Sequence, residues 1–167
     1  MEDVTRLLAY EEIRQLVARY AFAIDTRDLE TLVGLFVPDV RVTGGHIGRD
    51  ELGKEFDRQL RSIGRSVLNV GTHVIELGDT DHATGWVYTK AEIESAGRWI
   101  HQSILYEDTY ERRWPDGWLF VRRVHRLWYG AEPGVNPLNL PLANWPERHD
   151  GLGTVPEHFA TWRAFWT

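Results

Sequence analysis

The sequence predicts an α+β fold, in which a curved antiparallel sheet forms a cone and N-terminal helices enclose a pocket. Two observations lead to this fold class. Apolar residues recur at helical spacing up to about residue 63, and from Ser66 onward the period changes to two. Four strand-like segments with turn sequences between them then follow. Helices followed by an antiparallel meander are typical of helices packed on one face of a sheet.

Composition limits the classes of protein to which the chain can belong. Its 167 residues are enough for one domain with a core and too few for two of ordinary size. The net charge of −6 argues against nucleic acid as a partner, because phosphate-binding surfaces are normally basic. No apolar run approaches the roughly 20 residues that span a bilayer, and the N-terminus is too charged for a secretory signal. We therefore expect a cytoplasmic protein without a membrane partner.

Helical spacing of apolar residues predicts a first helix across residues 5–24. Asp28 is expected to cap a second, shorter helix, so that Asp25 lies in a very short link between the two. A third helix is expected from about Glu51 to Ile63, with Asp50 as its cap.

The strands are expected where the period is two and turn sequences intervene. The turns are "GDTD", "SAGR" and "WPDG". The predicted strands are Ser66–Leu77, His82–Glu94, Trp99–Arg113 and Trp118–Tyr129. In the first of them, regular alternation would place one set of residues on a common face, namely Val67, Asn69, Gly71, His73, Ile75 and Leu77.

The composition changes near residue 131. Residues 131–167 are rich in proline, glycine and tryptophan, and a short helix from Pro156 is the one regular element expected there. We interpret this segment as a C-terminal extension of the same domain as residues 1–130. Since its tryptophans favour burial, it is expected to cover the pocket or a subunit interface. A curved sheet also leaves one face exposed, so we expect a homo-oligomer.

Asp25 and His73 are the first candidate site residues. Asp25 follows an apolar helix stripe, and a carboxylate that faces the core needs a hydrogen-bonding partner. His73 lies among apolar or small residues on its strand, so its ring nitrogens also need partners. Pairing the two would fix the imidazole tautomer and make the other nitrogen a better base. A structural core histidine and a capping aspartate are the alternative interpretation.

The last two strands supply further candidates. His101 and Tyr106 fall on opposite sides of the third strand, and at most one of these sides lines a pocket. Arg123, on the fourth strand, would hold a carbonyl or anionic oxygen if it points inward, and would solvate the sheet if it points outward.

Several other chemistries lack their sequence signatures. The absence of cysteine excludes disulfides and thiolate nucleophiles. The seven histidines match no standard metal-site spacing, so no metal is expected. No glycine-rich phosphate loop and no G-x-S-x-G nucleophile elbow is present. Acid–base chemistry without a cofactor therefore remains.

Three stretches together resemble a known family. "YAFAIDTRDLETLVGLFVPDV", "GTHVIEL" and "YEDTYERRWPDGWLFVRRV" are similar to the SnoaL-like branch of the nuclear transport factor 2-like superfamily, over about residues 5 to 130. The resemblance implies an α+β cone with an interior ligand pocket. It also favours a homotrimer, with a dimer as the alternative.

The resemblance also implies roles for individual residues. Asp25 and His73 look like the Asp–His dyad of hexachlorocyclohexane dehydrochlorinase, scytalone dehydratase and bile-acid dehydratase. Tyr20 resembles a catalytic tyrosine of the bile-acid dehydratase, although the dehydrochlorinase has a lysine there. His101 resembles the second histidine of scytalone dehydratase, and Arg123 resembles a pocket arginine of the dehydrochlorinase.

The leading hypothesis is a cofactor-independent lyase of the dehydratase type, acting on a small hydrophobic oxygenated ring compound. His73, Asp25 and Tyr20 would be catalytic, and His101, Arg123 and Tyr106 would bind the substrate. An isomerase or cyclase with the same base, or a non-catalytic ligand-binding protein, are the alternatives.

Overall fold

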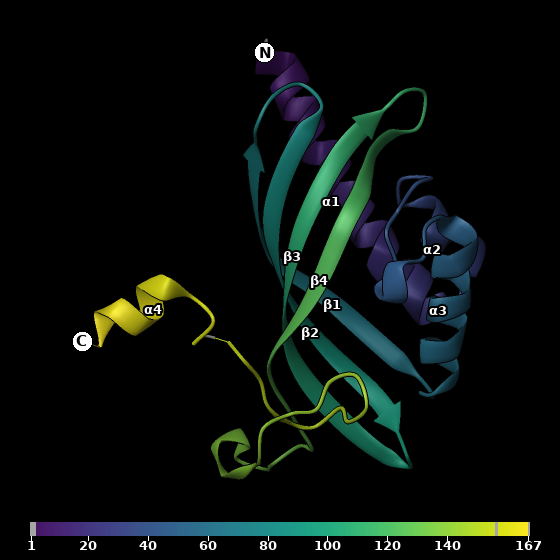
Figure 1. Ribbon diagram of the computed structural model, residues 1–167. Helices are drawn as coiled ribbons and strands as arrows, with labels where there is room; N and C mark the ends of the chain where they lie inside the picture. The colour runs from purple at the N-terminus through teal and green to yellow at the C-terminus, as the bar shows by residue number, and fades with distance from the viewer. Residues whose placement is uncertain (1–2, 156, 167) are drawn as a thin grey trace.

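Helices at the N-terminus precede one five-stranded sheet in the computed structural model, which describes residues 3–155 and 157–166. The elements are α1 (Asp3–Thr26), α2 (Leu29–Gly34), η1 (Thr43–Gly45), α3 (Arg49–Arg61), β1 (Ser66–Leu77), β2 (His82–Ser95), β3 (Arg98–Arg113), β4 (Gly117–Ala131), η2 (Pro137–Asn139), β5 (Gly151–Leu152) and α4 (Ala160–Phe165). Figure 1 shows α1 running along one face of the curved sheet, with α2 and α3 together at one side. This arrangement confirms the predicted α+β cone.

The sheet is an antiparallel meander in which each strand pairs with the next along the chain. The bounds of β1 are those predicted, and β2, β3 and β4 extend one or two residues beyond the prediction. Alternate residues of β2 are buried, including Ala83, Val87 and Ala91, so one face of the sheet lies toward the helices and the other lies outward. We call these the inner face and the outer face.

A β-bulge in β1 corrects the predicted alternation. Val70 pairs with Thr89 and His73 pairs with Val87, so two residues of β1 stand opposite a single residue of β2. The bulge shifts the alternation by one residue. His73 therefore shares its face with Val70 and not with Asn69, and the single-face set predicted from the sequence is wrong before the bulge.

The helices bury their apolar residues against the sheet and against one another. On α1, Ile13 and Val17 are fully buried, and Asp28 caps α2 as predicted by accepting a hydrogen bond from the amide of Thr31 (3.0 Å). The predicted cap of α3 is wrong: Gly48 is the N-cap, and Asp50 lies inside the first turn. Among the described helices, none is long and apolar enough to cross a membrane.

Asp25 joins the end of α1 to the beginning of β1. Its Oδ1 accepts a hydrogen bond from Ser66 Oγ (2.9 Å), and its Oδ2 accepts one from the backbone amide of Leu68 (2.8 Å). Arg27 donates to the same Ser66 hydroxyl (2.9 Å). A strand amide and a serine hydroxyl are therefore the partners that this carboxylate required.

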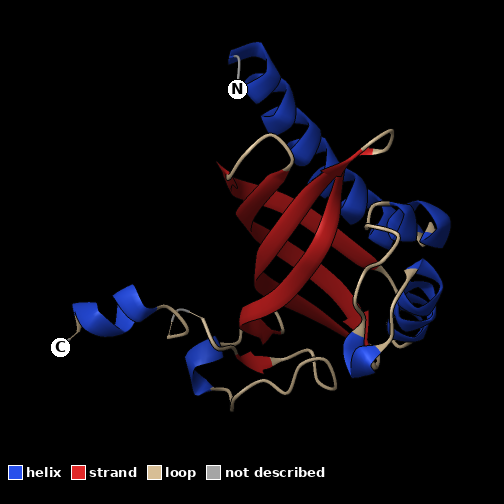
Figure 2. Cartoon of the chain, turned by 45° about the horizontal axis from the view of Figure 1, so that its top comes forward, coloured by secondary structure: helices blue, strands red, loops and turns tan. Residues whose placement is uncertain are grey.

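The C-terminal extension lies along β4 by main-chain contacts. Its short strand β5 pairs with β4, and the amide of Gly153 donates to the carbonyl of Trp128 (2.8 Å). A side chain at Gly153 would overlap the carbonyl of Leu127, and one at Gly130 would overlap the carbonyl of His149, so glycine permits the close approach at both positions. Farther on, α4 lies away from the sheet (Figures 1 and 2), and the predicted helix start at Pro156 lies outside the described residues.

We predict that Asp25→Ala lowers the free energy of unfolding by about 1–3 kcal/mol, because it leaves the Leu68 amide without its acceptor. Urea denaturation followed by circular dichroism measures this loss. The matched control is Asp57→Ala on α3, which removes an exposed ion pair with Arg61 and should cost under about 1 kcal/mol. Equal losses for the two variants would contradict a structural role for Asp25.

Candidate active site

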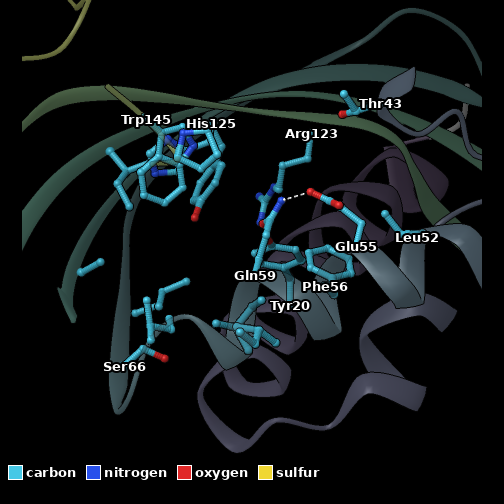
Figure 3. A pocket seen from close by; sticks show the side chains of 18 of the residues that line it. Tyr20, Thr43, Leu52, Glu55, Phe56, Gln59, Ser66, Arg123, His125 and Trp145 are labelled. Atoms are coloured by element: carbon cyan, nitrogen blue, oxygen red, sulfur yellow. Dashed lines mark hydrogen bonds between the residues drawn. The ribbon is translucent and has the colours of Figure 1, made fainter. Parts of the chain in front are cut away.

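A cavity of about 390 Å³ lies between the inner face of the sheet, α3 and the C-terminal extension. Figure 3 shows its side chains, with the stacked rings of His125 and Trp145 on one side and with Tyr20 and Phe56 below Arg123. Its lining is mainly apolar, and the residues with polar or aromatic groups include Tyr20, Glu55, Phe56, Gln59, Ser66, Gln102, Tyr106, Arg123, His125, Trp145 and His149. Such a cavity is suited to a small, largely apolar ligand.

Aromatic rings from four elements meet at the inner end of the cavity. The ring of Tyr20, on α1, makes edge contacts with those of Phe36, Phe56, Tyr106 and Phe120, at centroid distances from 5.7 to 6.3 Å. Burial raises the pKa of the Tyr20 hydroxyl and that of Tyr106, so both remain protonated and able to donate. The cluster gives the cavity a rigid apolar wall with two phenols.

A buried ion pair joins β3 to β4 beside these rings. Arg123 Nε donates to Asp108 Oδ1 (2.8 Å) and Nη2 donates to Oδ2 (2.7 Å), while the Tyr110 hydroxyl donates to Oδ2 (2.7 Å). The side chains of Asp108 and Arg123 are only 0% and 3% exposed. Burial alone would lower the pKa of Arg123, but the Asp108 carboxylate outweighs it and the pKa is raised. The arginine is therefore a permanent cation in an apolar site.

The remaining nitrogen of this guanidinium has no hydrogen-bond partner in the part of the chain that the structure describes. Arg123 Nη1 is buried and makes no hydrogen bond within the described part of the chain. The guanidinium carbon lies 4.3 Å from the ring centroids of Tyr20 and Tyr106 and 4.4 Å from that of Phe120. These rings stabilise the cation from its faces, and Nη1 remains a buried donor whose hydrogen-bonding capacity is unused within the described residues.

His125 is the cavity's buried imidazole. Its ring stacks on that of Trp145 (4.0 Å between centroids, 10° between planes) and meets the edge of Tyr106 at 5.5 Å. Both ring nitrogens are buried, and neither has a hydrogen-bond partner among residues 3–155 and 157–166. Burial lowers the pKa of His125 to about 3, so the imidazole is neutral at pH 7.

Two of the remaining polar groups at the cavity are already paired. Glu55, on α3, accepts hydrogen bonds from Gln59 (2.6 Å, dashed in Figure 3) and Arg58 (2.6 Å). His149 approaches Ser95 Oγ with its Nδ1 (3.2 Å), and its carbonyl accepts from Gln102 Nε2 (2.8 Å). Among the described lining residues, the buried polar atoms without a hydrogen-bond partner belong to Arg123 and His125 on β4 and to Gln102, through its Oε1, on β3.

Three of the six predicted site residues line the cavity: Tyr20, Tyr106 and Arg123. Their catalytic or binding roles stay predictions. His101 does not line it, because residues of odd number in this part of β3 point to the outer face; its side chain is 47% exposed and lies 3.9 Å from Glu92.

Asp25 and His73 do not form the predicted dyad in this structure. Asp25 is paired with Ser66 and Leu68, near the start of β1. His73 lies beyond the bulge, where its Nε2 is 3.1 Å from the hydroxyl of Tyr110. Neither residue is among those that line the cavity. Burial lowers the pKa of His73 to about 4.

His125 and Trp145 are the site residues that sequence reasoning missed. His125 stands two residues after Arg123 on the same strand, and this spacing could have identified it, since an inward Arg123 implies an inward His125. Trp145 gave no comparable signal, because its segment has no periodicity from which its docking on β4 could be inferred.

No group of three or more histidine, aspartate or glutamate side chains that could hold a metal ion occurs among the described residues. The polar groups of the cavity include a cation, a neutral imidazole and two phenols, which together suit an oxygen-bearing organic ligand.

The fold and the cavity define a cone-shaped α+β protein with an enclosed ligand site. The family model of the SnoaL-like domain matches residues 5–124, so the chain belongs to this family, a branch of the nuclear transport factor 2-like superfamily. Comparison with curated protein sequences gives no match.

Solved structures of similar fold include lyases. A candidate scytalone dehydratase from Novosphingobium aromaticivorans is 21% identical, with a TM-score of 0.68 over 81% of this chain and 94% of that one. The type 3 hexachlorocyclohexane dehydrochlorinase from Novosphingobium barchaimii is 17% identical, with a TM-score of 0.71 over 81% and 97%. A Mycobacterium tuberculosis protein of unknown function is 26% identical, with a TM-score of 0.61 over 78% and 82%. The two neighbours below 25% identity share the fold of this chain, in agreement with the family match.

We predict that Arg123→Met lowers the free energy of unfolding by about 3–5 kcal/mol, because it leaves the Asp108 carboxylate buried without its counter-ion. Urea denaturation measures the loss. The double variant Asp108→Leu/Arg123→Met should lose less than the sum of the two single variants. Arg61→Met, at an exposed ion pair, is the control and should cost under about 1 kcal/mol. A loss for Arg123→Met no larger than the control's would refute the coupling.

A second prediction concerns acid. The pKa of His125 is about 3 in the folded protein and near 6.5 when unfolded, so below pH 6.5 the unfolded chain binds the extra proton. Stability is fully present above pH 6.5 and falls as the pH is lowered toward 3. His125→Phe should reduce this slope by up to about 1.4 kcal/mol per pH unit between pH 6 and 4. Urea titrations at several pH values measure it, and an unchanged slope would mean that His125 is not buried.

Proposed function

We propose that this protein is a cofactor-independent enzyme that eliminates water from a small, largely apolar ring compound carrying a carbonyl and a hydroxyl group. One observation carries the proposal: Arg123 and His125 line the same cavity, and the buried Nη1 of the first and both ring nitrogens of the second have no hydrogen-bond partner among the described residues. The two residues are two apart on one strand, a spacing of roughly 7 Å along the backbone. A ring compound of one or two rings spans that distance.

Arg123 would bind the substrate's carbonyl oxygen. Its charge is permanent, its orientation is fixed by Asp108, and Nη1 is free to donate. A cation held in an apolar cavity stabilises negative charge that develops on the oxygen more strongly than water does, because it needs no reorganisation. Since Asp108 already neutralises the guanidinium, a neutral carbonyl is favoured over a carboxylate as the bound group.

His125 would take a proton from the carbon next to that carbonyl. The neutral imidazole has a free acceptor nitrogen at pH 7. Its low pKa makes it a weak base in the empty cavity, but an enolate forming at Arg123 would stabilise the imidazolium and increase its basicity as the reaction proceeds. The imidazolium would then return the proton to the hydroxyl on the next carbon. The C–O bond breaks, a C=C bond forms, water leaves, and His125 is neutral again.

The phenols of Tyr20 and Tyr106 would supply further donors to the oxygens of the substrate. Both hydroxyls remain protonated at neutral pH, since burial raises their pKa. Trp145 would fix the plane of the imidazole by stacking on it. None of these roles depends on the oligomeric state, so the expected homotrimer stays a prediction.

Ligand binding without catalysis is the second candidate function. The pKa of about 3 at His125 favours it, because so weak a base is better suited to hydrogen bonding than to proton transfer near pH 7. A panel of β-hydroxy ketones, such as 3-hydroxycyclohexanones and 3-hydroxytetralones, incubated in D₂O separates the candidates by mass spectrometry. Loss of one water supports the dehydratase. Deuterium uptake without water loss supports an isomerase, and binding without either change supports the binding protein.

We predict that His125→Gln lowers turnover of a substrate found in this way by about 10²–10⁴-fold, the usual contribution of a general base. Steady-state kinetics measure it. His101→Gln, on the outer face, is the matched control and should retain wild-type turnover. His73→Gln should retain most of it. Loss of turnover in His73→Gln together with its retention in His125→Gln would overturn the proposed base and restore the predicted one.

A further inference from the structure

We propose that His73 is a positioning residue for Arg123, acting through a chain of hydrogen bonds that passes from His73 to Tyr110 to Asp108. The inference rests on the proposed function, because Arg123 is the group that would hold the substrate's carbonyl. The chain links a half-buried histidine on β1 to the cavity, across β3.

The direction of each hydrogen bond follows from the chemistry of the groups. Asp108 accepts two hydrogen bonds from Arg123 and is therefore an ionised carboxylate, so the Tyr110 hydroxyl must donate its one proton to Oδ2 (2.7 Å). The contact between Tyr110 and His73 Nε2 (3.1 Å) then requires the histidine to donate. His73 must carry its proton on Nε2, and that nitrogen is not available as a base.

The contact between His73 and Tyr110 requires a residue without a side chain at position 85 of β2. A side chain at Gly85 would lie 3.2 Å from the Tyr110 ring, 3.3 Å from His73 Nε2 and 2.8 Å from the carbonyl of Val74. The bulge before His73 brings its ring to the inner face, where Tyr110 also points. His73 and Tyr110 are therefore held together by packing as well as by their hydrogen bond.

The hydrogen bond from His73 affects Arg123 by holding the Asp108 carboxylate, its partner, more firmly in place. A hydroxyl that accepts one hydrogen bond becomes a better donor in the next, so donation from His73 strengthens the bond from Tyr110 to Asp108. It also fixes the hydroxyl in the orientation that reaches Oδ2. Without the histidine donor, Tyr110 can turn its proton away, and the carboxylate that orients Arg123 loses one of its three hydrogen bonds.

Nitrogen-15 NMR of the whole protein without ligand tests this series of hydrogen bonds directly. The imidazole shifts should show the Nε2–H tautomer at His73 near pH 7. The Nε–H of Arg123, assigned with Arg123→Lys, should exchange with solvent about three- to tenfold faster in His73→Phe, which cannot donate. His73→Gln, which can donate, should restore the wild-type rate. The Nε–H of Arg49, which donates to the carbonyl of Phe36 (2.8 Å), is the internal reference for changes in global stability.

Tyr110→Phe removes the hydroxyl that connects His73 to Asp108, and it is the last variant that the experiment needs. If His73 acts only through Tyr110, the double variant His73→Phe/Tyr110→Phe should exchange no faster at Arg123 than Tyr110→Phe alone. An Nδ1–H tautomer at His73, unchanged exchange in His73→Phe, or failure of the glutamine variant to restore the rate would each overturn the proposal. These measurements need no turnover, so a failure of the dehydratase proposal would be recognised separately, by the kinetics of His125→Gln.

Discussion

The buried pair of Asp108 and Arg123 is the interaction on which the rest of the site depends. Because two opposite charges with almost no solvent contact must satisfy each other, they fix how β3 and β4 face the interior at this level. Aromatic rings from α1, β3 and β4 then surround the guanidinium, and two of them, Tyr20 and Tyr106, also line the cavity. The pair leaves Arg123 Nη1 without a hydrogen-bond partner among the described residues, and in the proposed function this nitrogen binds the carbonyl oxygen of the substrate.

The chemistry of the site rests on the chain's own residues. Neighbours of about 20% identity share the fold, and their activities do not determine which side chain accepts a proton here. In this chain the carboxylate at the end of α1 holds the first strand, and the histidine of β1 donates to a tyrosine. The more deeply buried of the two imidazoles at the cavity, that of His125, comes from β4. The base that we propose thus lies on a different strand from the one that the resemblance suggested.

Most of the fold was predictable because it follows from periodicity. The change from helical to strand period at Ser66, and the turn sequences between strands, place β1 to β4 to within two residues. The site was predictable only in part. A bulge of one residue before His73 is not visible in the alternation, and Asp25 bonds to a backbone amide that any residue could provide. The docking of Trp145 depends on main-chain contacts of an aperiodic segment, about which side-chain patterns carry no information.

The glycines that admit the C-terminal extension have an evolutionary consequence. At Gly130 and Gly153 the extension and β4 meet backbone to backbone, and Gln102 holds the carbonyl of His149. Attachment of this kind places little demand on the identity of the side chains at positions 145, 146 and 149, which line the cavity. Substitutions can therefore change the side chains of one wall of the cavity while the cone stays intact. A lineage of such proteins could diverge in ligand preference by drift at these positions, because main-chain contacts hold the segment to the sheet.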